Sequence, residues 1–322
     1  MFFIKFKNIF VRVKRQVQAN RGNIALQMPL PQDWKDKSKE PIEFSQFPIK
    51  TEDKNKQEEP IDYSQFAIKT IRGYTGMRQE MLGGLPDLKE VLDVGYTDKK
   101  SKNHERRKRH YLGENKWPET SDGELKNTID NYAERNAEVG HVLLGLLSEA
   151  LVGSGDLFNE TFGSDALQVQ RLTRYPASAE IPDRKEGEIG SGVHTDYGGL
   201  TLLHADGPGL AVLKPDLSSN SSLAGTFSPE LEFPHSEEWL EVESRPGTLI
   251  AMAGEALQIL SHGRILAAKH KVDLPPHLQR HSLAFFLDPR PDALLQPLPE
   301  LKRADRPAYK AKLAGHKGVV KH

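Results

Sequence analysis

The sequence predicts a mainly β fold, an antiparallel barrel or jelly roll braced by helices. Short apolar runs separated by Gly, Pro or Ser recur through the second half of the chain, as is typical of antiparallel strands joined by turns. They follow one long segment with helical periodicity, which needs a large apolar surface to lie against. A chain of 322 residues with 37% hydrophobic content is long enough to bury a sizeable core.

Residues 1–70 are expected to form an atypical N-terminal extension, and residues 71–322 a single domain. In residues 1–16 the apolar side chains fall at helical spacing among several lysines and arginines, and no acid precedes Asp33. Such a segment resembles an organelle-targeting helix, but it lacks the expected serines, and a surface helix or a strand that pairs with the barrel is the favoured interpretation. The predicted location is cytoplasmic, with an organellar one as the alternative.

The extension also contains an internal repeat. Residues 40–51 recur as residues 59–70, with nine of the twelve positions identical. Two copies are too few for a solenoid, in which at least three stacked units bury a shared core. We interpret the repeat as a local duplication.

Residues 121–152 are predicted to form one amphipathic helix. Ser121 and Glu124 have the spacing of a capping box, apolar residues recur from Leu125 to Ala150, and Gly153 can end the helix. The sheet expected from residues 167–290 is the large apolar surface on which it can pack. The basic run within residues 98–110 is interpreted as a solvated loop.

Strand-like runs occupy most of the region after residue 190. They lie at residues 200–204, 210–213, 239–243, 247–253 and 256–260. The long stretch of residues 214–238, rich in Ser and Pro, is expected to be a surface excursion.

Composition excludes several classes of function. Lysine and arginine number 44 against 45 acids, so no overall field attracts nucleic acid or an anionic membrane, and a small-molecule partner is expected. The absence of cysteine excludes disulfides, zinc–thiolate sites and thiol nucleophiles. No apolar run reaches the length of a membrane span. The sequence does not indicate an oligomeric state.

Three residues have the pattern of a metal site. His194 and Asp196 are two apart, so their side chains project to the same side of an extended chain, and His270 follows on a later strand. Two imidazoles and one carboxylate fill one face of an octahedron, which suits non-haem iron(II) and dioxygen. Four further histidines near this pattern are expected to be structural or exposed, with His262 as an alternative to His270. They are His204, His262, His277 and His281.

The ordered motifs resemble the isopenicillin N synthase-like iron(II) and 2-oxoglutarate-dependent oxygenases. The similarity covers residues 71–290, with H-x-D at 194–196, a later histidine at 270 and R-x-S followed by aromatics at 280–286. It implies a double-stranded β-helix core, with His194, Asp196 and His270 as the iron ligands. It also implies that Arg280, Ser282 and Tyr175 clamp 2-oxoglutarate, for which the planar donor fork of arginine is well suited.

The implied activity is the oxidation of a small-molecule C–H bond by iron(II), 2-oxoglutarate and dioxygen, in specialised or amino-acid-derived metabolism. Hydroxylation, desaturation and oxidative ring closure all begin with hydrogen abstraction and stay open. Two alternatives remain. The first is an oxidase independent of 2-oxoglutarate, in which the clamp holds the carboxylate of the substrate. The second is a non-catalytic scaffold, because the N-terminal strand–helix–strand unit of the family has no match before residue 72.

Overall fold

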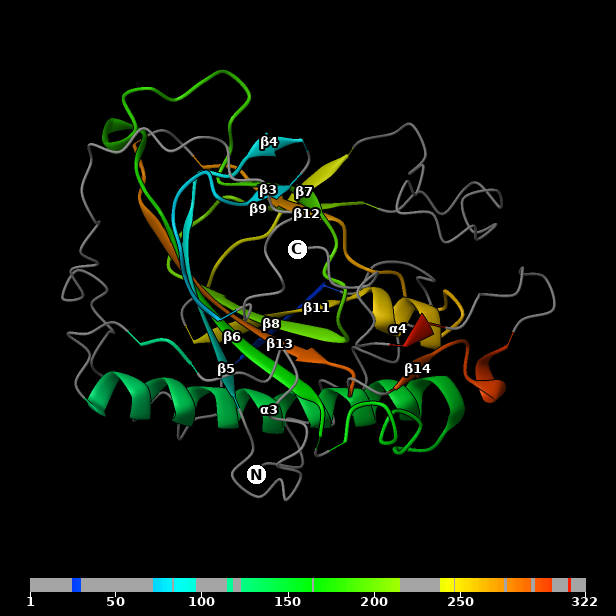
Figure 1. Cartoon of the computed structure of the whole chain (residues 1–322). Helices are drawn as coiled ribbons and strands as arrows, with labels where there is room; N and C mark the ends of the chain where they lie inside the picture. The colour runs from blue at the N-terminus through cyan, green and yellow to red at the C-terminus, as the bar shows by residue number, and fades with distance from the viewer. Residues whose placement is uncertain are drawn as a thin grey trace.

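Two antiparallel sheets face each other in the computed structural model, and a long helix lies beneath the larger one (Figure 1). The structure describes residues 25–29, 72–82, 84–96, 115–117, 123–163, 165–214, 238–245, 247–274, 277–290, 293–302 and 312–313. This arrangement confirms the predicted class, a mainly β fold with a double-stranded β-helix core and bracing helices.

The larger sheet, here the major sheet, has seven strands. In spatial order these are β1 (Ala25–Pro29), β11 (Thr248–Ala253), β8 (Leu200–Ala205), β13 (Arg280–Asp288), β6 (Leu167–Tyr175), β5 (Glu90–Tyr96) and β2 (Gly73–Thr75). The longest pairing joins β13 to β6 over nine residues, with Arg280 opposite Tyr175. Because side chains alternate along a strand, Arg280, Ser282 and their alternate neighbours project toward the other sheet.

The smaller sheet, here the minor sheet, has four strands. They are β10 (Trp239–Glu241), β9 (Leu210–Leu213), β12 (His270–Val272) and β7 (Ser191–His194). Two short hairpins complete the strands, β3 (Met81–Leu82) with β4 (Leu85–Pro86) and β14 (Leu294–Leu295) with β15 (Lys312–Leu313). Single 3-10 turns lie at η5 (Ser178–Glu180) and η6 (Pro299–Leu301). Apolar side chains fill the space between the major and minor sheets, including Leu203, Val212, Met252 and Ala284.

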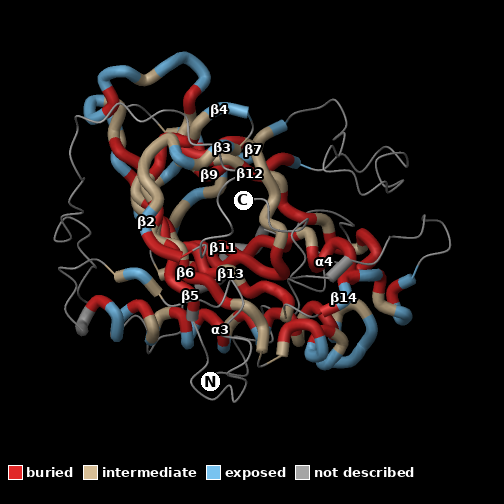
Figure 2. Tube along the Cα trace, viewed as in Figure 1, coloured by how far each residue is buried: buried red, intermediate tan, exposed pale blue. Residues whose placement is uncertain are grey.

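Helix α3 (Gly123–Val152) packs on the outer face of the major sheet, as its periodicity predicts. Its inner residues share one apolar cluster with Phe285 and Leu287 of β13. Contact is close at Gly140, where an added Cβ would lie 2.8 Å from Cδ2 of Leu287. Figure 2 shows the result, with buried residues concentrated in the major sheet and along the side of α3 that faces it.

One predicted strand is wrong. Residues 256–260 belong to a short helix, α4 (Glu255–Leu260), in which every residue from Ala256 to Leu260 is buried. A short segment that is buried on all sides carries no amphipathic period, so its apolar run reads equally well as a strand. The predicted strand at 239–243 is also shorter in the structure, because β10 ends at Glu241.

The predicted N-terminal extension supplies a strand that the sequence did not reveal. Strand β1 pairs antiparallel with β11 over five residues, from Ala25 opposite Met252 to Pro29 opposite Thr248. It forms one edge of the major sheet. The domain boundary at residue 71 remains a prediction.

Several predicted segments lie outside the described residues. They are the targeting-like segment 1–16, both copies of the repeat, the basic run and residues 215–237 of the surface excursion. Among the helices that the structure does describe, none is both long and apolar enough to cross a membrane.

Candidate metal centre and adjoining cavities

His194, Asp196 and His270 converge at one end of the minor sheet. His194 is the last residue of β7, His270 is the first residue of β12, and the antiparallel register places these two residues opposite each other. Asp196 follows two residues after the end of β7. One side-chain ligand atom from each of the three residues lies within 4.8 Å of the others.

Both imidazoles present the same nitrogen to the carboxylate. Nδ1 of His194 lies 2.8 Å from the carbonyl oxygen of Gly192, and Nδ1 of His270 lies 2.9 Å from that of Ala268. Since a carbonyl only accepts, each Nδ1 carries the proton, and each Nε2 has a free lone pair. The Nε2 atoms lie 3.7 and 3.9 Å from Oδ1 of Asp196. Burial, followed by the neighbouring His270, lowers the pKa of His194, which keeps this ring neutral.

The orientation of Asp196 is fixed by the residues around it. The Thr201 hydroxyl donates a hydrogen bond to Oδ2, which leaves Oδ1 directed at the imidazoles. The first residues of α4 hold the backbone of this loop, because the amide of Glu255 donates to the carbonyl of Asp196 at 2.8 Å. Thr195 also donates to Oε1 of Glu255 at 2.6 Å. The carboxylate therefore has one preset oxygen for a metal.

All six site residues predicted from the sequence line one small cavity of about 60 Å³, here the metal cavity. Its lining includes His194, Asp196, His270, Arg280, Ser282 and Tyr175. Apolar residues from both sheets complete its walls, among them Leu203, Leu210 and Met252.

Arg280 is the unusual side chain of this cavity. It is only 1% exposed, its Nε donates to the carbonyl of Gly207 at 3.3 Å, and neither Nη1 nor Nη2 has a hydrogen-bond partner in the described structure. The ring of Tyr175 lies 5.0 Å from its central carbon. A buried guanidinium with two bare nitrogens needs an anion, and a carboxylate matches its fork.

These residues fit the two groups that the sequence implies. Two neutral imidazole nitrogens and one carboxylate oxygen form a donor set suited to ferrous iron. Arg280 and Ser282 offer charge and a hydroxyl to a carboxylate in the same cavity. His262 lies outside the set of three, in a turn with a positive φ of 50°. His281 contacts Asp206 through Nδ1 at 2.9 Å.

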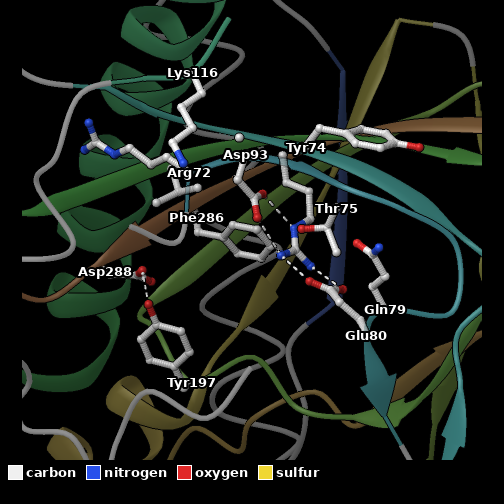
Figure 3. Close-up of a pocket in the computed structure, with 13 residues that line it drawn as sticks. Arg72, Tyr74, Thr75, Gln79, Glu80, Asp93, Lys116, Tyr197, Phe286 and Asp288 are labelled. Carbon is white, nitrogen blue, oxygen red and sulfur yellow. Dashed lines mark hydrogen bonds and ion pairs between the residues drawn. The ribbon is translucent and has the colours of Figure 1, made fainter. Parts of the chain in front are cut away.

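A second cavity of about 340 Å³, here the outer cavity, lies beside the first (Figure 3). Phe286 and Arg171 line both cavities, and Tyr197 of the outer cavity directly follows Asp196 in the sequence. The wall between them therefore consists of residues on β6 and β13 and of the loop that carries the metal-site carboxylate.

A chain of ion pairs runs along this wall. Arg171 contacts Asp93 at 2.7 Å and Glu80 at 3.0 Å, and Glu80 in turn contacts the ammonium of Lys89 at 3.0 Å. Lys89 also contacts Asp87 at 2.8 Å, whose other oxygen accepts from the amide of Gly192. Although burial opposes it, Asp93 and Glu80 raise the pKa of Arg171. These charges tie β5 and β6 to the strand that bears His194.

Sequence reasoning did not find Thr201, Lys89 or Asp288 as site residues. Asp288 could have been found, because it continues the alternation of Arg280, Ser282 and Phe286 along one face of β13. Thr201 is the second residue of β8, the strand after the metal pair, and it lines the same cavity. Lys89 and its acidic partners carry no motif, because tertiary packing alone brings them together.

Comparison with known proteins shows which family the core resembles. Residues 164–289 match the model of the 2OG-Fe(II) oxygenase superfamily. This range contains β6 to β13 and all six predicted site residues.

Two relatives from Arabidopsis thaliana illustrate the likeness. A homoarginine-6-hydroxylase is 29% identical over 227 residues, which cover 70% of this chain and 62% of the relative. Jasmonate-induced oxygenase 2 is 31% identical over 202 residues, which cover 62% of this chain and 47% of the relative. The chain spans less than two thirds of the length of these curated relatives.

Solved structures agree on the fold. The crystal structure of JOX2 in complex with 2OG, Fe and JA aligns with a TM-score of 0.64 at 24% identity, over 94% of this chain and 79% of that one. A dioxygenase for auxin oxidation in rice aligns with a TM-score of 0.52 at 23% identity, over 77% of this chain and 69% of that one. The matched core, the fold and the histidine–aspartate–histidine group of this chain thus resemble those of the 2OG-Fe(II) oxygenase superfamily.

Proposed function

We propose that this protein is an iron(II)- and 2-oxoglutarate-dependent oxygenase that oxidises a C–H bond of a small molecule. One observation carries the proposal. The unpartnered guanidinium nitrogens of Arg280 line the same cavity as the three converging side chains of His194, Asp196 and His270. A metal site alone would not require a buried, unpaired cation beside it. A chelating oxo-acid requires the metal for one end and a cation for its distal carboxylate.

Each residue has a definite task in this proposal. His194 and His270 would hold iron through Nε2, and Asp196 through Oδ1, with Thr201 restraining the other carboxylate oxygen. Arg280 and Ser282 would hold the distal carboxylate of 2-oxoglutarate, and the Tyr175 phenol would add a third donor. When bound, iron and 2-oxoglutarate supply the activation of dioxygen and an oxidant for unactivated C–H bonds. The apolar walls exclude water from that chemistry.

The relatives favour hydroxylation in amino-acid-derived or specialised metabolism. They include the homoarginine-6-hydroxylase of Arabidopsis thaliana and a 2-oxoglutarate-dependent dioxygenase of Monascus ruber, which is 28% identical over 233 residues. Hydroxylation is the simplest outcome of hydrogen abstraction, so we propose it ahead of desaturation and ring closure.

The test separates the metal from the co-substrate. Purified protein should bind iron(II) with an affinity better than micromolar, and it should release succinate and carbon dioxide from 2-oxoglutarate. His270→Ala should lose metal binding while keeping its fold, because it removes a ligand and little core volume.

Two results would replace the proposal with its alternatives. Oxidation of a substrate with strict independence from 2-oxoglutarate would make the protein an oxidase whose Arg280 binds the substrate carboxylate. Failure to bind iron(II), together with no effect of His270→Ala, would make it a scaffold.

A further inference from the structure

The outer cavity is placed where a substrate would reach the metal site. It shares Phe286 and Arg171 with the metal cavity, and Tyr197 joins it to the loop of Asp196. A volume of about 340 Å³ is at the lower end of what small-molecule sites occupy. Its lining is polar for such a site, with Arg72, Glu80, Asp93, Lys116, Arg171 and Asp288 all charged types.

Most of these charges are already engaged. Arg171 donates to both oxygens of Asp93, at 2.8 and 2.7 Å, and to both oxygens of Glu80, at 3.2 and 3.0 Å. Arg72 lies across β5, since a Cβ on Gly95 would lie 2.0 Å from its Nη2. Figure 3 shows its guanidinium directed away from the other lining side chains. These groups shape the wall and leave little charge for a ligand.

Asp288 is different, because it is a buried acid without a cation. It is 3% exposed, and the one hydrogen bond of its carboxyl group within the described structure comes from the Tyr197 hydroxyl at 2.9 Å. Burial raises the pKa of Asp288 to about 7, as expected of a carboxyl whose charge has no counter-ion. A buried acid that lines a cavity is offset when a ligand brings the missing donor or cation.

Lys116 has the complementary property. Its stem packs on Gly73, and its ammonium makes no hydrogen bond or ion pair with any described residue. The residue is exposed, which places its charge at the solvent side of the cavity. In Figure 3, Lys116 lies above the Phe286 side chain, and the Asp288–Tyr197 pair lies below it and to its left.

We infer that the outer cavity binds the substrate, and that the substrate is a small amphoteric molecule with a basic nitrogen at Asp288 and an acidic group at Lys116. The inference rests on the proposed function and names the substrate class of that site. Because Asp288 and Tyr197 both lie close enough to Asp196 to be affected by its charge, the basic nitrogen lies on the side of the cavity that faces the metal site. The oxidised carbon is therefore close to that nitrogen, and the aliphatic part lies against Phe286.

Three related compounds test this on the full-length chain. Homoarginine carries an acid and a guanidinium, hexylguanidine lacks the acid, heptanoate lacks the guanidinium, and both partial compounds also lack the α-amino group. Isothermal titration calorimetry on metal-free protein would give each Kd without turnover. We expect homoarginine to bind at least about tenfold more tightly than either partial compound, the effect of one charged contact.

Two variants assign the contacts. Asp288→Asn keeps the shape of the side chain. It should raise the Kd of homoarginine and of hexylguanidine about tenfold and leave the Kd of heptanoate unchanged. Lys116→Met should raise the Kd of homoarginine and of heptanoate and leave the Kd of hexylguanidine unchanged. Glu160→Gln and Lys126→Met, which remove exposed charges elsewhere, should change no Kd.

The outcomes separate this inference from the proposed function. Equal binding of the three compounds, or equal weakening of all three in Asp288→Asn, would overturn the inference. Binding of 2-oxoglutarate and its slow substrate-free turnover by the unaltered chain would then still support the oxygenase. Loss of both from the unaltered chain would instead remove the proposed function.

Discussion

At the scale of single residues, Arg280 shows how function opposes stability. Leaving a buried charged donor unpaired costs roughly 1–3 kcal/mol or more, and this guanidinium leaves two nitrogens bare at 1% exposure. The fold tolerates the cost because Tyr175 covers one face of the group and Gly207 accepts from Nε. A bound carboxylate would remove it.

Replacing Arg280 by lysine should strongly weaken the binding of 2-oxoglutarate. The lysine ammonium is a point charge and cannot reproduce the two parallel hydrogen bonds of the fork, so the KM for 2-oxoglutarate should rise at least about tenfold. Steady-state kinetics would measure it, with the iron(II) affinity as the control expected to stay constant. An unchanged KM would count against the clamp.

Asp288 should make the stability of the protein depend on pH. Its pKa is raised from 3.8 to about 7 in the folded state, so its contribution to stability is greatest in acid and is lost as the pH rises toward about 7. The loss is roughly 4 kcal/mol at most. Asp288→Asn should therefore melt higher than the unaltered chain at pH 8, with little difference at pH 4.

Thermal melts of metal-free protein between pH 4 and pH 9 would measure this difference. Glu160→Gln serves as the control, since that acid is exposed. A difference in Tm between Asp288→Asn and the unaltered chain that does not change with pH would show that Asp288 carries no such strain.

The six residues that the sequence predicts as site residues line one cavity in the structure, and each belongs to an ordered local motif. The residues that restrain them could not be predicted. Asp87 is two residues from Lys89, but Glu80 reaches Lys89 only across the β3–β4 hairpin, and no motif in the sequence marks that ion pair. Asp288 could be predicted in part. Strand alternation indicates which face of β13 it lies on, but only the packed structure shows that no cation lies beside it among the described residues.

At the scale of elements, the start of α4 supports the metal-site loop. Gly254 donates to the carbonyl of Gly199 at 2.8 Å, and the next amide, of Glu255, donates to Asp196. This contact is possible only without a side chain at position 254, where a Cβ would lie 2.3 Å from the carbonyl oxygen of Gly198. The segment read as a strand from its sequence because its burial hides the helical period.

Gly254→Ala should displace that loop and weaken metal binding. The added methyl group meets backbone atoms that cannot rotate away, so Asp196 must move, and we expect the iron(II) affinity to fall about tenfold or more. Gly155→Ala is the matched control, because nothing lies within 4 Å of its Cβ position. Metal titration of both variants would decide it, and equal affinities would contradict the prediction.

At the scale of the whole molecule, the fold class followed from the recurrence of strands and from the long amphipathic helix. The contribution of β1 could not be predicted, because a single strand of five residues is too short to give the sequence a distinctive hydrophobic period. Its place beside β11 comes from a long-range pairing that only the assembled sheet reveals.

Removing β1 should expose β11 as a free sheet edge. A chain shortened through residue 29 loses the five-residue pairing, and unpaired edges favour aggregation. We expect its Tm to fall by a few degrees and its light scattering on heating to increase. A chain shortened only through residue 20 keeps the strand and should behave as the full-length protein does.

Strand β13 borders the metal cavity with its first residues and the outer cavity with its last ones. Its first residues, Arg280 and Ser282, face the metal cavity alone, while Phe286 and Asp288 at its far end border the outer cavity. The opposite face is anchored to α3 through Phe285 and Leu287. Substitutions of Asp288 can therefore reshape the outer cavity without altering any residue that lines the metal cavity.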